Sequence, residues 1–101
     1  MHILSWSKIR KFIDLHPESL GPLRTWFDSL EKRNYTSFND LRCVFPSVDR
    51  IYLKSGKERY IFNVGGNRYR LICSIHFNRA KVFVRFVLTH SEYDQEAWKN
   101  E

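Results

Sequence analysis

Apolar residues in the first third of the chain recur at helical spacing. The first set comprises Trp6, Ile9, Phe12 and Ile13. The second set comprises Leu23, Trp26, Phe27 and Leu30. Residues at these intervals share one face of a helix, so the pattern predicts two amphipathic helices. Pro17 can open the second helix at its first position, and Pro22 is then tolerated in a locally distorted first turn.

A third, short helix is predicted just before Pro46. Ser37 and Asp40 have the S-x-x-D spacing of a capping box, and Leu41 and Val44 follow as apolar positions. The helix should end ahead of Pro46, because the residue that precedes a proline is disfavoured in the helical conformation.

From about Arg50 onward the apolar spacing changes to two, which is typical of strands. Strands are predicted at residues 59–64, 68–77 and 81–88, separated by turns at 65–67 and 78–80. In the second strand one face carries Tyr69, Leu71, Cys73, Ile75 and Phe77. In the third strand one face carries Val82, Val84, Phe86 and Leu88, with Arg85 opposite. Such short turns predict antiparallel neighbours.

These elements predict a single α+β domain over residues 1–101. The N-terminal helices pack on one face of a small antiparallel β-sheet, and a short C-terminal helix follows the last strand. The other sheet face should present Arg68, Arg70, His76 and Arg85. A face with several cations is a poor core and a good platform for anions.

The charge distribution supports a polyanionic partner. The chain has 17 Lys and Arg against 11 Asp and Glu, a net charge of +6. Much of the excess lies in one stretch, where only Glu58 opposes Lys54, Lys57, Arg59, Arg68, Arg70, Arg79, Lys81 and Arg85. A localised positive field favours nucleic acid, a ribosome surface or an acidic protein. The alternative is a solvated basic face that serves solubility alone.

Other classes of protein are disfavoured. Cys43 and Cys73 stand 30 positions apart and form no disulfide framework, which fits a reducing cytoplasm. No apolar run reaches the ~18 residues of a membrane span, so no membrane association is expected. The four histidines are scattered, which predicts no metal site and no other cofactor. Gly65 and Gly66 precede a strand, so they form no phosphate-binding P-loop.

The segment from His90 to Asp94 carries the candidate chemistry. Ser91 and Asp94 fit a second capping box, which would place His90 between the last strand and a short helix, with Tyr93 in its first turn. Metal-free RNA cleavage needs a base for the 2′-hydroxyl, positive charge at the phosphate and an acid for the leaving oxygen. His90 can act as base or acid, Arg70 suits the phosphate, and Tyr93 can stack on a base or exchange a proton. Structural roles remain open for each of these residues. His90 could be a strand-end histidine that bonds a carbonyl, Tyr93 a half-buried helix residue, and Asp94 only the capping partner of Ser91.

Two motifs resemble those of the HigB family of RelE-like toxins. The segment from Phe62 to Leu71 is similar to F-N-[IV]-x-G-N-[KR]-Y-R-L, and the segment from Arg85 to Asp94 to R-F-V-G-T-H-x-E-Y-D. His16-Pro17, residues 22–26 and residues 45–47 also resemble that family, so the resemblance covers nearly the whole chain in order.

The resemblance implies a RelE-like fold and an endoribonuclease that cuts mRNA, in many relatives on the ribosome, and so inhibits translation. It implies a HigA-type antitoxin with a helix-turn-helix domain, and operator DNA binding only through the toxin–antitoxin complex. Carried onto this sequence, the catalytic residues are Arg70, His90 and Tyr93. The substrate-binding residues are Arg68 and Arg85, followed by Lys81 and Asn67.

Two other functions remain open at this point. The basic face could belong to a non-catalytic RNA- or ribosome-binding inhibitory module, which would bind RNA in a salt-sensitive way. It could also belong to a structural protein that meets only an acidic partner. Loss of activity in His90→Ala and Arg70→Ala would favour the enzyme over both.

Overall fold

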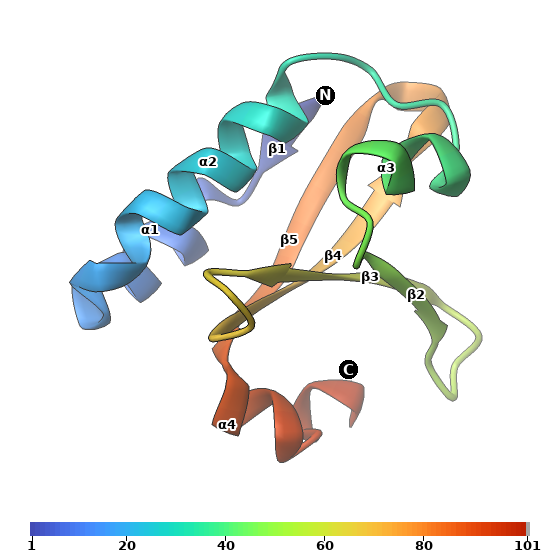
Figure 1. Ribbon diagram of the computed structural model, residues 1–101. Helices are drawn as coiled ribbons and strands as arrows, with labels where there is room; N and C mark the ends of the chain where they lie inside the picture. Colours follow the sequence, from blue (N-terminus) through green and yellow to red (C-terminus); the bar gives the residue numbers. More distant parts are fainter. Residues whose placement is uncertain (101) are drawn as a thin grey trace.

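The computed structural model of the chain describes residues 1–100 and has an α+β architecture (Figure 1). Its elements are, in chain order, β1 (His2–Leu4), α1 (Trp6–Leu15), the 3₁₀ helix η1 (Pro17–Ser19), α2 (Leu20–Glu31), α3 (Phe38–Val44), β2 (Asp49–Tyr52), β3 (Glu58–Val64), β4 (Tyr69–His76), the 3₁₀ helix η2 (Phe77–Arg79), β5 (Lys81–Thr89), α4 (His90–Asp94) and the 3₁₀ helix η3 (Ala97–Asn100). The α+β prediction is thus confirmed.

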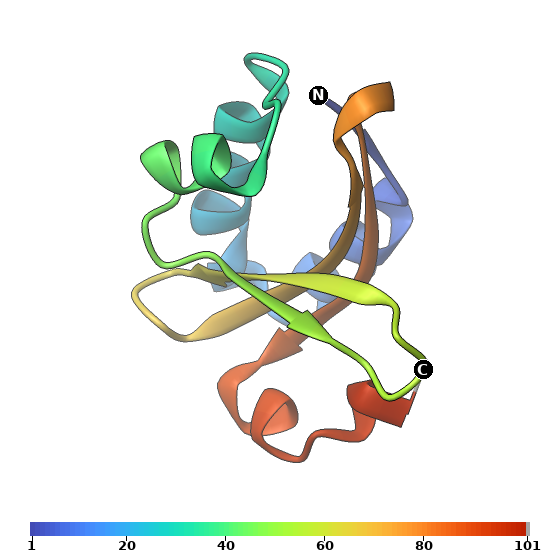
Figure 2. The ribbon, with the colours of Figure 1, turned by 90° about the vertical axis from the view of Figure 1, so that its right-hand side faces the viewer.

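One five-stranded sheet forms the middle of the molecule, in the order β1-β5-β4-β3-β2. Strands β3, β4 and β5 pair antiparallel, as the short turns predict, and β2, for which no strand is predicted, pairs antiparallel with β3. The edge strand β1 was not predicted, and it pairs parallel with β5, where His2 lies opposite Lys81. The sheet is therefore mixed. Helices α2 and α3 lie on one side of it and α4 on the other (Figures 1 and 2).

The helical predictions are confirmed. Pro17 opens η1, which continues directly into α2, and Pro22 lies in the first turn of α2. The buried positions of α1 and α2 are Ile9, Phe12, Leu23, Trp26 and Leu30. They join one large cluster with the inward residues of β3, β4 and β5. Edge-to-face contacts of Phe62 with Trp26 and Phe45, at ring centroid distances of 5.4 and 5.2 Å, link helices to sheet.

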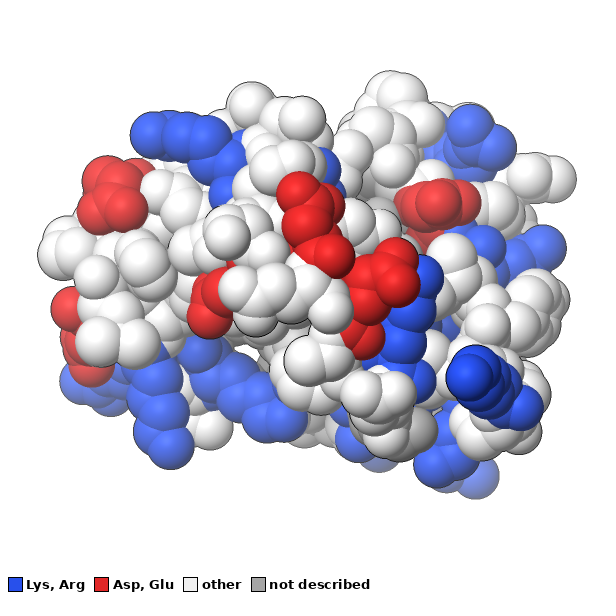
Figure 3. Space-filling view, turned by 90° about the horizontal axis from the view of Figure 1, so that it is seen from below, with Lys and Arg blue, Asp and Glu red and all other residues white. Residues whose placement is uncertain are grey.

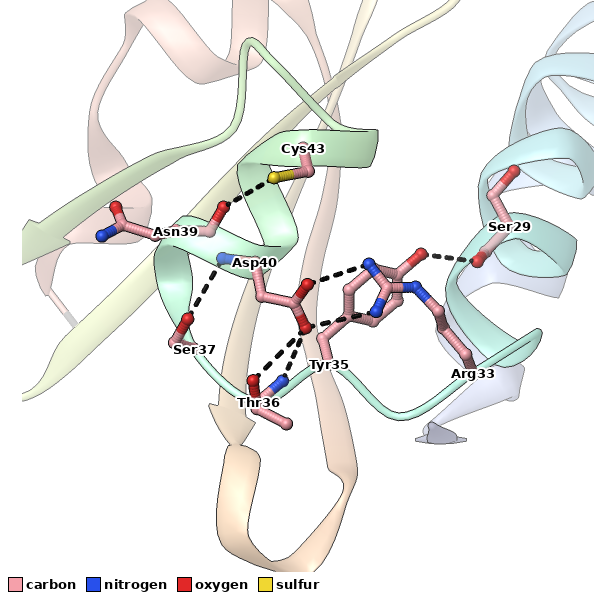
Figure 4. A network of polar contacts seen from close by, with 8 residues as sticks. All are labelled: Ser29, Arg33, Tyr35, Thr36, Ser37, Asn39, Asp40 and Cys43. Atoms are coloured by element: carbon pink, nitrogen blue, oxygen red, sulfur yellow. Dashed lines mark hydrogen bonds and ion pairs between the residues drawn. The ribbon is translucent and has the colours of Figure 1, made fainter.

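A polar network fixes α3 against the end of α2 (Figure 4). The Asp40 carboxylate accepts both Nη groups of Arg33, at 3.3 and 3.0 Å, and the backbone N–H of Thr36 at 2.9 Å. These bonds hold the pKa of Asp40 below its usual value, with the Arg33 bond the largest cause. Ser37 caps α3 as predicted. The Asp40 carboxylate, however, accepts from Arg33 and Thr36. The predicted capping box would instead have it accept the backbone N–H of Ser37.

A β-bulge at Arg85 changes the faces of β5. Ile72 pairs with Phe86 and Cys73 with Val84, so Arg85 is an extra residue in β5. Val82 and Val84 face the helices, but Phe86 and Leu88 pack on the opposite side of the sheet. The prediction that these four residues share one face is therefore wrong, because a one-residue insertion inverts the alternation after it.

The face away from the helices is only partly basic. It carries a second apolar cluster of Leu53, Ile61, Ile72 and Trp98, which the C-terminal segment covers. Figure 3 views the molecule from below, from the side of α4, and shows red Asp and Glu atoms in the middle and at the left of this face, interspersed with blue Lys and Arg atoms that also line its lower and right-hand sides. The predicted cationic face is thus interrupted by an apolar cluster and by acidic side chains. Among residues 1–100, no helix has the length and hydropathy of a membrane span.

Candidate active site

Arg70 is a buried arginine at the start of β4, on the sheet face away from the helices. The residue is only 6% exposed. Nη1 donates to the carbonyl oxygens of Asn67 and Tyr69, at 3.0 and 3.1 Å. Nη2 donates to the side-chain oxygen of Asn67 and lies 3.1 Å from Nδ1 of His90. All four Nη hydrogens thus have acceptors, which leaves the Nε hydrogen of this five-donor group for a ligand.

The turn between β3 and β4 prepares the acceptors for Arg70. Gly65, Gly66 and Asn67 have φ values of 68°, 60° and 79°. Glycine adopts this left-handed region freely, and asparagine tolerates it better than most residues. A Cβ atom on Gly65 would lie 2.9 Å from the Tyr69 ring. The turn can therefore bring Asn67 back over Arg70 only with glycine at position 65.

His90 is the first residue of α4, and its backbone N–H donates to the carbonyl of Arg68 at 2.9 Å. Thr89 caps this helix, with Glu92 as its capping-box partner. The predicted box of Ser91 and Asp94 is wrong because the helix begins at His90 itself, and Thr89-x-x-Glu92 fits the same pattern two residues earlier. The Asp94 carboxylate therefore reaches Nε2 of His90 at 3.2 Å.

The contacts of His90 determine where its proton lies. A guanidinium can only donate, so Nδ1 of His90 accepts from Arg70 and carries a lone pair. In the neutral ring the proton is consequently on Nε2, where it faces the Asp94 carboxylate. The side chains of His90 and Asp94 are 50% and 60% exposed. The imidazole thus connects a buried cation to a carboxylate at the surface.

Tyr93 lies between two flat groups. Its ring stacks on Trp98 with a centroid distance of 5.2 Å and an interplanar angle of 12°. Cζ of Arg70 lies over the same ring at 5.2 Å from its centroid, within the range of a cation–π contact. Two such groups need opposite ring faces, so stacking of an RNA base on Tyr93 would require displacing one of them. The ring edge and the hydroxyl remain for other contacts.

Trp98 is a residue of this site that the sequence did not point to. Its side chain is buried in the second apolar cluster, and its Nε1 donates to the carbonyl oxygen of Tyr93 at 3.0 Å. It therefore holds both the backbone and the ring of Tyr93. No motif marks this role, because the contact depends on the way η3 folds back under the sheet.

The other predicted substrate-binding cations lie apart from Arg70. Arg68 is in the turn, where its Nε donates to the carbonyl of Gly65 at 3.1 Å and its guanidinium approaches the Tyr69 ring. Arg85 donates to Oγ of Ser74 at 3.0 Å. Lys81 begins β5, which puts it roughly 30 Å from His90 at about 3.3 Å per residue. Of this set, Asn67 bonds the Arg70 side chain, and the backbone carbonyl of Arg68 accepts the N–H of His90.

Other catalytic chemistries have little support from the described residues. Burial raises the pKa of the Cys73 thiol well above its usual value, which makes a Cys73 nucleophile unsuitable. Residues 1–100 contain no group of three or more His, Cys, Asp or Glu side chains placed to hold a metal ion. The chemistry available at the site is that of an arginine, a histidine, a tyrosine and an aspartate in contact.

Comparison with known proteins points to one family. Residues 19–96 match the HigB toxin family, described as the RelE-like toxic component of a toxin–antitoxin system. The mRNA interferase toxin HigB of Escherichia coli K12 is 31% identical over 94 residues, which cover 93% of this chain and 88% of that protein. The mRNA interferase HigB of Shigella flexneri has the same identity and coverage. That of Escherichia coli O6:H1 is 27% identical over 95 residues, or 94% and 90% of the two chains.

Proposed function

The chain belongs to the HigB family of RelE-like toxins, and on that premise we propose that Arg70, His90 and Tyr93 cleave mRNA without a metal ion or other cofactor. The observation that carries this proposal is the chain of contacts Arg70–His90–Asp94. It joins a phosphate-binding group, a proton acceptor and a carboxylate in one unit.

His90 is the general base in this mechanism. Its Nδ1 lone pair is held by Nη2 of Arg70 in the free protein. A scissile phosphate that accepts from Arg70 draws the guanidinium away from that lone pair, which is then able to take the proton of the ribose 2′-hydroxyl. Asp94, bonded to Nε2, stabilises the positive charge that His90 acquires.

Arg70 stabilises the charge that develops on phosphorus. As the 2′-oxygen forms its bond to phosphorus, negative charge grows on the non-bridging oxygens, and the positively charged guanidinium bonded to the phosphate lowers the energy of this state. The bond to the 5′-oxygen then breaks, and Tyr93 is the member of the site left to protonate it. The products are a 2′,3′-cyclic phosphate and a 5′-hydroxyl.

The test is cleavage of RNA by the purified protein in EDTA, with and without ribosomes, followed by chemical identification of the ends. We expect 2′,3′-cyclic or 3′-phosphate ends from the wild type and none from His90→Ala of the same fold. A strict magnesium requirement would contradict the mechanism. A growth defect that persists in His90→Ala would instead favour a non-catalytic RNA- or ribosome-binding module.

The antitoxin that partners this toxin is proposed to be of the HigA type, with a helix-turn-helix domain that brings the complex to operator DNA. The substrate mRNA is proposed to be cut on the ribosome, in the cytoplasm, by residues 1–101 acting as one domain. Inhibition follows if the antitoxin covers the active site or holds the toxin away from the ribosome. Equal cleavage by the free toxin and the saturated complex would refute this.

A further inference from the structure

A polar hollow of about 370 Å³ lies directly beside Arg70 and Tyr93. The residues around it that matter here are Arg42, Ser47, Asp49, Asn63, Arg70 and Tyr93. These residues come from α3, from the loop between α3 and β2, from the strands β2, β3 and β4, and from α4. The volume is within the range of about 300–1,000 Å³ that is usual for small-molecule sites.

The hollow adjoins the proposed catalytic residues, because Arg70 and Tyr93 line it. Asn63 lies directly opposite Arg70 in the ladder between β3 and β4. Directly opposed side chains in such a pair are separated by about 5 Å at Cβ. A group seated over Asn63 would therefore belong to a nucleotide next to the phosphodiester held at Arg70.

The polar groups of the hollow suit the edge of a nucleobase. Asp49 and Asn63 are both exposed. One oxygen of Asp49 accepts the backbone N–H of Arg50 at 3.0 Å, which leaves further lone pairs on the carboxylate. The amide of Asn63 offers both a donor and an acceptor. Arg42 and Arg70 line the same hollow and supply positive charge for the phosphates on either side.

We propose that this hollow is a nucleobase subsite that binds guanine next to the cleaved bond, with Asp49 and Asn63 as its specificity-determining residues. Single-stranded RNA is recognised mainly through base edges of this kind. A carboxylate accepts two adjacent N–H donors, and among the four bases only guanine presents them, at N1 and N2. Its O6 then accepts from Asn63 or Arg42. This assignment rests on the proposed RNA cleavage.

The test compares wild type, Asp49→Asn, Asn63→Ala and the control Asp14→Asn, an exposed carboxylate on α1. Each purified protein is given a pool of mRNAs of varied sequence, with and without ribosomes, and the bases beside every cut are counted. We expect roughly tenfold enrichment of guanine at one fixed position for wild type and control, the scale of discrimination by a bidentate contact. The enrichment should fall below threefold in Asp49→Asn and Asn63→Ala.

Cutting by the wild type without guanine enrichment, or an unchanged enrichment in Asp49→Asn, would overturn the subsite while leaving the proposed function intact. Absence of any cutting by the wild type would contradict the proposed function instead. The hollow is then tested directly by titrating the four nucleoside 5′-monophosphates and following the Asn63 side-chain amide by NMR. Tighter binding of the guanine nucleotide, lost in Asp49→Asn, supports the subsite, and equal binding of all four overturns it.

Discussion

Nη2 of Arg70 and Nδ1 of His90 lie 3.1 Å apart, although the two residues are separated by 20 positions in the chain. The contact forms because Arg70 is the second residue of β4 and His90 directly follows the adjacent antiparallel strand β5. It requires His90 to accept and Arg70 to donate, which sets the tautomer of the histidine.

Replacement of Asp94 by asparagine tests its effect on His90. The amide oxygen of Asp94→Asn can still accept from Nε2, so the ring orientation is kept, but the negative charge that stabilises protonated His90 is lost. We expect the rate of RNA cleavage to fall roughly 10- to 100-fold. This fall is smaller than that expected on losing the general base itself, because His90 is still present. Single-turnover cleavage measures this. A rate equal to that of the wild type would show that Asp94 serves only the fold.

Replacement of Trp98 tests how Tyr93 is positioned. Trp98→Phe keeps a ring to stack on Tyr93 but loses the N–H bond to its carbonyl, whereas Trp98→Ala loses both and opens a cavity costing about 3–5 kcal/mol. We expect Trp98→Phe to lower the cleavage rate at saturating RNA while RNA binding persists. Trp6→Phe on α1, remote from the site, is the control and should leave both unchanged. A normal rate in folded Trp98→Ala would contradict the positioning role.

The glycines of the turn between β3 and β4 offer a matched pair. Both Gly65 and Gly66 have positive φ, but an added Cβ meets Tyr69 at 2.9 Å only at Gly65 and finds open space at Gly66. Gly66→Ala should therefore cost about 1 kcal/mol of unfolding free energy, from backbone conformation alone. Gly65→Ala should cost about 2–3 kcal/mol, since steric strain adds to it. Urea unfolding of the two variants measures the difference, and equal losses would argue against the close approach to Tyr69.

The Arg33–Asp40 pair predicts a dependence of stability on pH. The pKa of Asp40 is lowered in the folded protein, chiefly by its bond to Arg33. Its contribution is therefore present above the pKa of the unfolded chain and is lost as pH falls through the lower, folded value. Asp40→Asn should be less stable than the wild type near pH 7, and the gap should narrow in acid. Urea midpoints across this range measure it. Asp28→Asn is the control, because it removes only the exposed pair with Arg24. We expect its urea midpoint to stay close to that of the wild type.

Much of the fold follows from local patterns. The spacing of apolar residues identifies α1 and α2, and the short turns identify the antiparallel order of β3, β4 and β5. The same pattern brings Arg70 near His90, since the end of β5 must return beside the start of β4. Strand β1 could not be predicted, because three residues are too few to show alternation and its partner β5 is far away in the sequence.

The parts of the site that escaped prediction depend on contacts distant in sequence. The bulge at Arg85 has no local signature, yet it turns Phe86 and Leu88 towards the second apolar cluster. That cluster buries Trp98, which in turn holds Tyr93. The burial of Arg70 could not be predicted from the sequence either, because the alternation of apolar and polar residues indicates only the face on which a side chain lies. The capping box of α4 could have been found, since Thr89 and Glu92 fit the motif as well as Ser91 and Asp94.

The most direct test is a double-mutant cycle of Arg70→Lys and His90→Ala, measured as single-turnover rates of RNA cleavage by folded protein. If the two residues act as one unit, each single change lowers the rate about 10²- to 10⁴-fold. The double variant is then no slower than the slower of the two single variants. Losses that multiply in the double variant would show that Arg70 and His90 act independently, and would contradict the mechanism.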